Sequence, residues 1–102
     1  MMGFATFTPG EAVLIPARVV HPVGAGLGDW GRALIETRWS QYTLAFIGDA
    51  VINGLARGVI LAPANSGAGK WDVQVENGLA GVVVTVPGDM LASALEPLRS
   101  AA

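Results

Sequence analysis

Residues 71–86 decide the fold class: Trp71-Asp72-Val73-Gln74-Val75-Glu76-Asn77-Gly78-Leu79-Ala80-Gly81-Val82-Val83-Val84-Thr85-Val86. Residues 71–76 alternate apolar and polar side chains, which is typical of a strand with one buried face. Asn-Gly is a strong hairpin signal because both residues accept a positive φ. The stretch therefore predicts a β-hairpin that turns at Asn77-Gly78 and returns over residues 81–86.

A second Asn-Gly pair, Asn53-Gly54, also lies between apolar runs. The sequences that follow the two pairs, NGLARGVILAP and NGLAGVVVTVP, are similar and indicate a weak internal repeat of one hairpin. Residues 11–20 are rich in β-branched side chains and predict a first strand, in which Pro16 indicates a sheet edge or a bulge. Residues 32–39 alternate in the same manner and predict another strand.

These patterns predict a mainly β fold, a small antiparallel barrel or roll, in a single domain covering residues 1–102. A short C-terminal helix is expected from Asp89, which can cap it, to about Leu95. One alternative stays open at this stage, an α+β fold with a helix over residues 42–62. Polar residues spaced by four favour that helix, whereas three glycines oppose it: Asp49, Asn53 and Arg57 against Gly48, Gly54 and Gly58.

The composition points to self-association. Hydrophobic residues make up 52% of the chain and charged residues 14%, against about 25% charged in an average domain. We therefore expect a homo-oligomer or a complex with a protein partner, in which apolar surface and strand edges are buried. The net charge of −2 and six scattered basic residues argue against nucleic acid and against a membrane surface. The chain has no cysteine and its first residues lack signal-peptide features, so a cytoplasmic location is expected.

The candidate binding residues gather in and near a glycine-rich segment, residues 21–32. They are His21, Asp29, Trp30 and Arg32, together with Trp71 further along the chain. Tryptophan is enriched in pockets and interfaces, which is why the two indoles are included. The segments GLGDWG (26–31) and ANSGAGK (64–70) approach nucleotide-binding motifs but are interpreted as loops. With one histidine and no catalytic constellation, neither a metal site nor a cofactor is expected, and the sequence favours a non-enzymatic protein without deciding the question.

Two families resemble parts of the chain. Residues 7–20 (FTPGEAVLIPARVV), with residues 84–91 and 95–98, look like the first and last strands of small SH3-like barrels, which are interaction modules without catalysis. Gly10, Pro16 and His21, followed by residues 32–36, are similar to the second motif of cupins, in which His21 would match a metal ligand. The first cupin motif is absent, so this resemblance implies a metal-free or incomplete cupin-like barrel. Both resemblances imply a small β-barrel.

Three functional hypotheses follow. We prefer a non-enzymatic binding or structural module that self-associates through apolar surface. The first alternative is a small ligand-binding or enzymatic β-barrel with a pocket near the glycine-rich segment 21–32. The second alternative, a viral or mobile-element structural protein, rests on the small size and the assembly-prone composition of the chain.

Overall fold

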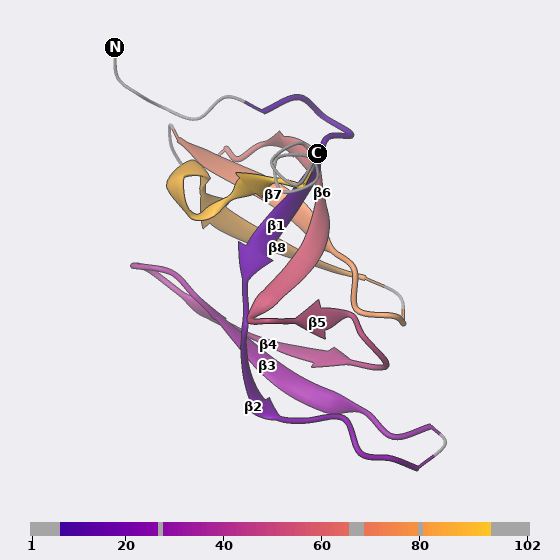
Figure 1. Ribbon diagram of the computed structural model, residues 1–102. Coiled ribbons are helices and arrows are strands. Elements are labelled where there is room, and N and C mark those ends of the chain that lie inside the picture. Colours follow the sequence, from indigo (N-terminus) through magenta and orange to yellow (C-terminus); the bar gives the residue numbers. More distant parts are fainter. Residues whose placement is uncertain (1–6, 27, 66–68, 80, 95–102) are drawn as a thin grey trace.

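The computed structural model describes residues 7–26, 28–65, 69–79 and 81–94 (Figure 1). Nearly all regular structure in these residues is β-strand, with one short 3₁₀ turn, η1. The elements, in chain order, are β1 (Ala12–Pro16), β2 (Arg18–His21), β3 (Gly31–Glu36), β4 (Gln41–Phe46), β5 (Val51–Ile52), β6 (Leu55–Pro63), β7 (Lys70–Val75), β8 (Val82–Pro87), η1 (Gly88–Met90) and β9 (Ala92–Ser93).

The strands form two sheets. The large sheet has the order β8-β7-β6-β1-β9, with β5 also paired to β6, and the small sheet has the order β2-β3-β4. Every pairing is antiparallel. The prediction of a mainly β, antiparallel fold is therefore confirmed. Over the described residues the sheets do not close into a barrel, because each ends in edge strands that pair on one side only.

The two sheets are joined where β1 passes into β2, at the centre of Figure 1. The single strand predicted over residues 11–20 is interrupted at Ala17, where the chain leaves the large sheet and enters the small one. Pro16 ends β1 opposite Leu55, and the amide of Ala17 then donates to the carbonyl of Gly54 at 2.8 Å. A proline at the end of a strand disrupts the ladder at this point, since it has no N–H to donate.

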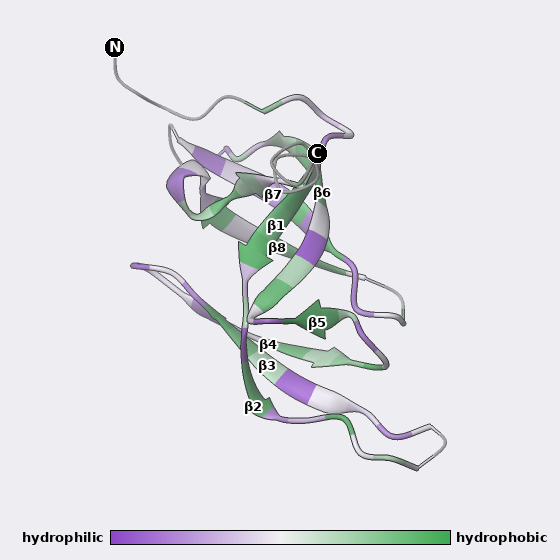
Figure 2. Ribbon diagram, in the orientation of Figure 1, coloured by the Kyte–Doolittle hydropathy of each residue, from purple (hydrophilic) through white to green (hydrophobic). Residues whose placement is uncertain are grey.

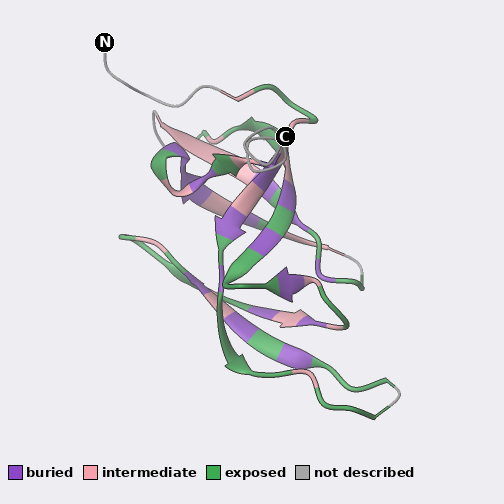
Figure 3. Cartoon of the chain, in the orientation of Figure 1, coloured by how far each residue is buried: buried purple, intermediate pink, exposed green. Residues whose placement is uncertain are grey.

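The core lies between the facing sides of the sheets. In β6 the buried and exposed residues alternate along the strand, as Figure 3 shows. The alternation follows from the two-residue period of a strand, which turns successive side chains to opposite faces. The largest fully buried side chains come from both sheets: Val13, Ile15, Ile35, Leu44, Ile60, Val73, Val75, Val84 and Val86.

The two Asn-Gly pairs turn the chain in different ways. Asn53 and Gly54 have φ values of 55° and 76° and form the predicted tight turn between β5 and β6. The β7–β8 hairpin is also present, but its connection spans residues 76–81 rather than two residues. Asn77 acts there through its side chain: Oδ1 accepts from the amides of Leu79 and Gly81 at 2.8 and 3.1 Å. The two copies of the repeat are therefore similar in sequence but form different turns.

The alternative helix over residues 42–62 is wrong. The segment forms β4, β5 and the first part of β6. Gly48 and Gly54 have φ values of 57° and 76°, and these left-handed conformations are incompatible with a continuous right-handed helix. The spacing of four between Asp49, Asn53 and Arg57 thus places two of them in turns and one on a strand.

The predicted C-terminal helix is also wrong over residues 89–94. Gly88–Met90 form a single 3₁₀ turn, and Ala92–Ser93 continue as β9, which pairs with β1. Asp89 does not cap a helix, because its carboxylate accepts from Arg38 at 2.9 Å. Leu95, the expected helix end, lies outside the described residues. Within the described residues, the structure contains no helix with the length and apolar character needed to cross a bilayer.

Candidate functional site

The large sheet leaves one face uncovered. β1 and β6 turn fully buried residues, such as Val13 and Ala56, towards the small sheet. Their other face, together with β5, we call the outer face; it carries Leu14, Ile52, Leu55, Arg57 and Val59. Ile52 is 52% exposed and Leu55 39% exposed, although both lie on hydrogen-bonded strands. Figure 2 shows the corresponding green stretches on β1 and β5.

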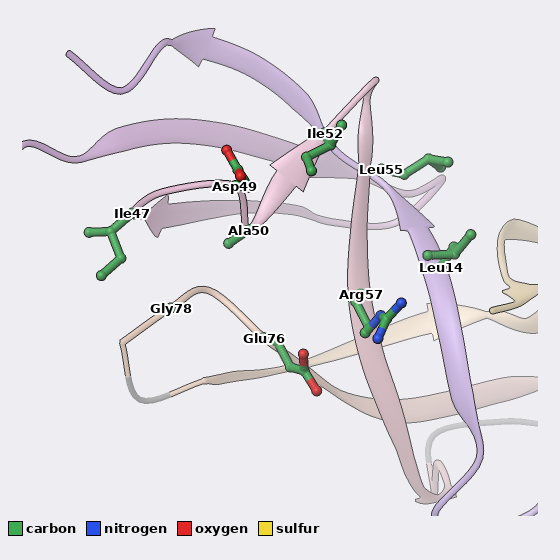
Figure 4. A pocket seen from close by; sticks show the side chains of 9 residues that line it. All are labelled: Leu14, Ile47, Asp49, Ala50, Ile52, Leu55, Arg57, Glu76 and Gly78. Carbon is green, nitrogen blue, oxygen red and sulfur yellow. The ribbon is translucent and has the colours of Figure 1, made fainter. Parts of the chain in front are cut away.

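A groove of about 520 Å³ runs along this outer face (Figure 4). Its floor is formed by β1, β5 and β6, and its walls by the β4–β5 turn and the β7–β8 loop. The amide of Ile47 donates to the carbonyl of Asn77 at 3.1 Å, which links the two walls. The lining residues are Leu14, Ile47, Asp49, Ala50, Ile52, Leu55, Arg57, Glu76 and Gly78.

The groove is apolar but carries three charges. Arg57 on β6 and Glu76, the first residue after β7, are neighbours, since the amide of Glu76 donates to the carbonyl of Arg57 at 2.8 Å. Asp49 lies apart from them, in the β4–β5 turn (Figure 4). Among the described residues, the ion pairs join Arg18 to Glu36 and Arg38 to Asp89, so the three groove charges are left without a charged partner. They are therefore available to groups that enter the groove.

A second groove of about 390 Å³ extends the first towards β8. The two share Glu76 and Gly78, and the second adds Leu79, which is 61% exposed. The grooved surface thus continues from β5 to the β7–β8 loop, and its second part mixes Val59 and Leu79 with polar side chains.

Two of the edge strands carry features that hinder pairing with a further strand. On β8, the backbone N–H and C=O of Thr85 are both bonded to the hydroxyl of Tyr42, and Pro87 ends the strand. On β2, the register with β3 shifts between Val19 and His21. Bulges, prolines and bonded backbone groups are the devices that prevent edge-to-edge pairing. These features hinder strand addition beside Thr85 on β8 and along β2.

The structure brings together three of the residues predicted as a binding site. The rings of His21 and Trp30 lie 6.5 Å apart, tilted by 50°, and the guanidinium of Arg32 lies 5.5 Å from the centre of the Trp30 ring. Trp30 is 48% exposed. The cluster combines an aromatic surface with a cation that stacks on it.

Asp29 and Trp71 are placed differently. The carboxylate of Asp29 accepts from the amide of Gly26 at 2.9 Å, so it stabilises its own turn. Trp71 lies on β7 in the large sheet and packs edge-on against Phe7, with ring centres 5.6 Å apart. Its Nε1 is buried without a hydrogen-bond partner within the described residues. Neither side chain joins the cluster around Trp30.

Sequence reasoning missed the groove residues. Arg57 is the only charged residue of β6, and the residues two positions before and after it, Leu55 and Val59, are apolar. That pattern places an isolated charge on an otherwise apolar strand face, which is the signal that could have identified it. The three charges come from different turns and strands, so their convergence is a property of the tertiary structure.

The described residues offer no group of three His, Asp or Glu side chains arranged to hold a metal ion. Comparisons of the chain with protein-family models, with curated proteins and with solved structures gave no match. The function must therefore be inferred from the geometry and chemistry of the chain itself.

Proposed function

We propose that this chain is a non-enzymatic binding or structural module that self-associates through the outer face of its large sheet. One observation carries the proposal: Ile52 and Leu55 are 52% and 39% exposed on an ordered, hydrogen-bonded face. Burial of apolar area contributes about 25 cal/mol per Å², so a partner that covers this face gains free energy.

A second copy of the chain is the partner that we favour. The chain is only 14% charged, so every copy carries the same excess of apolar surface. The groove also carries one cation and two carboxylates, so a second copy can offer a carboxylate to each Arg57. Self-complementarity is the requirement for a two-fold symmetric interface.

The test is the molar mass in solution, measured by light scattering coupled to size-exclusion chromatography over a range of protein concentration. We expect a discrete oligomer for the wild-type chain and a 10.5 kDa monomer for the double variant Ile52→Thr/Leu55→Thr. Val20→Thr is the matched control, because Val20 is 43% exposed but lies on the small sheet. A wild-type chain that remains monomeric at every concentration would exclude the proposal.

A second candidate function is ligand binding at the loop between β2 and β3. The observation that favours it is the half-exposed Trp30 with Arg32 stacked on it and His21 alongside. An aromatic ring beside a guanidinium suits a planar ligand that bears a carboxylate. The test is titration with benzoate, followed by NMR. Binding that is unchanged in Trp30→Ala would exclude a site at this loop.

A structural role in a virus or mobile element is a special case of self-association. It requires the chain to form large symmetric particles or rings rather than a small oligomer. Electron microscopy of the concentrated protein distinguishes the two outcomes.

A further inference from the structure

We infer that the self-associated form is a face-to-face, two-fold symmetric dimer in which Arg57 of each subunit pairs with an acidic groove residue, Asp49 or Glu76, of the other. The inference rests on the proposed function and adds the mode of docking and the contacts that specify it. It rests on the exposed apolar side chains of the outer face, the unpaired charges of the groove and the arrangement of those charges.

The mode of docking is favoured by backbone groups at two strand edges and by side chains of the outer face. Tyr42 occupies the outward backbone groups of Thr85 on β8, at 3.2 and 3.3 Å. The bulge in β2 interrupts a regular ladder on the edge of the small sheet. These features disfavour addition of a strand beside Thr85 on β8 and along β2. The outer face offers exposed apolar side chains instead, and sheet faces associate by packing side chains against side chains.

The charges then determine the orientation. Arg57 lies on β6, in the floor of the groove, and Asp49 lies apart from it in the β4–β5 turn, which forms one wall (Figure 4). A two-fold axis that passes between them exchanges their positions and brings each Arg57 to an acidic residue of the second copy. Without such a pairing, the second copy would bury Arg57 against aliphatic side chains such as Leu14 and Leu55, which is strongly unfavourable for a guanidinium.

An ion pair between Arg57 and a carboxylate of the second copy competes with an ion pair between Arg57 and Glu76 of the same chain. Arg57 and Glu76 are adjacent in the sheet, yet no N–O distance of 4 Å or less joins them. Both residues line the groove (Figure 4). The guanidinium has five donors in a planar fork, so it can hold a carboxylate of the second copy in a bidentate pair.

Charge-swapped variants test this contact. Arg57→Glu makes the groove entirely acidic, and Asp49→Lys/Glu76→Lys makes it entirely basic. For each variant alone, we expect the dimer dissociation constant to be about 30-fold or more above that of the wild-type chain. The variant is then monomeric at concentrations at which the wild-type chain is a dimer. We expect an equimolar mixture of the two to form a heterodimer, because the opposite charges now face each other. Arg38→Glu, with the same change of charge far from the groove, serves as the control, and circular dichroism verifies that each variant is folded.

Each outcome bears on the inference in a distinct way. Wild-type dimers whose dissociation constant is unchanged by both charge variants would overturn the docking mode and leave the proposed self-association intact. Monomeric variants that do not form a heterodimer when mixed would overturn pairing in trans. A monomeric wild-type chain would overturn the proposed function itself. If a variant fails to fold, the wild-type chain alone still decides: its dissociation constant must rise several-fold from low to high sodium chloride concentration, and a constant value contradicts the ion pairs.

Discussion

The hydroxyl of Tyr42 on β4 bonds both backbone groups of Thr85 on β8, accepting from its N–H at 3.3 Å and donating to its C=O at 3.2 Å. This contact joins the small sheet to the large one. It also occupies the outward-facing groups of an edge strand that would otherwise be open to a foreign strand. One side chain thus stabilises the packing of the sheets and blocks one route to uncontrolled association.

Removal of this hydroxyl tests both roles. We expect Tyr42→Phe to lower the free energy of unfolding by about 1–2 kcal/mol, because two backbone groups of Thr85 lose their partner. The denaturation midpoint in urea measures this loss. The Thr85 amide should also exchange faster with deuterium than in the wild-type chain. An unchanged midpoint together with unchanged exchange would mean that the contact stabilises neither the fold nor the edge.

The two Asn-Gly pairs should respond in opposite ways to the same substitution. Asn53→Gly should change stability by less than about 0.5 kcal/mol, because glycine adopts the positive φ of 55° as readily as asparagine. Asn77→Gly should destabilise the fold by about 2 kcal/mol, because the buried Oδ1 accepts two backbone hydrogen bonds. The measurement is the unfolding midpoint of each variant, and equal effects would refute the distinction between the two turns.

Gly31 marks a close approach between the small sheet and the preceding loop. A Cβ atom at this position would lie 2.6 Å from the carbonyl oxygen of His21 and 2.9 Å from the ring of Phe46. We therefore expect Gly31→Ala to destabilise the fold by about 1–3 kcal/mol through overpacking. The Phe46→Leu variant provides a double-mutant cycle with Gly31→Ala. The combined loss should be smaller than the sum of the single losses, because leucine removes the clash with the Phe46 ring and leaves those with the His21 carbonyl oxygen and the Val23 amide nitrogen; strict additivity would contradict the contact with Phe46.

The ion pair between Arg38 and Asp89 should contribute little to stability. The side chains are 63% and 69% exposed, although the two atoms lie 2.9 Å apart. Exposed pairs contribute about 0–1 kcal/mol because solvent screens them and because the side chains lose conformational freedom. We expect Asp89→Asn to shift the unfolding free energy by less than about 0.5 kcal/mol. A loss similar to that of Tyr42→Phe would show that this pair, rather than the buried contact, joins the sheets.

Much of the fold could be predicted from local patterns. The alternation in residues 71–76 gave β7 with Val73 and Val75 buried, and the alternation after residue 31 gave β3 with Ala33 and Ile35 buried. The candidate site was less predictable. Three of the residues named from the glycine-rich segment do cluster, but the groove on the outer face was missed because its charges are distant in sequence.

The sequence by itself determined the strands, the faces they bury and the tight turn at Asn53-Gly54, because these depend on the two-residue period of a strand and on the φ preferences of adjacent residues. The tertiary structure alone decided that Ala92–Ser93 pair with β1 instead of continuing a helix. It also decided that Tyr42 reaches Thr85, 43 residues away, and that Arg57 is left unpaired on an apolar face. These outcomes depend on which surfaces pack together, and residues that are far apart along the chain decide them jointly.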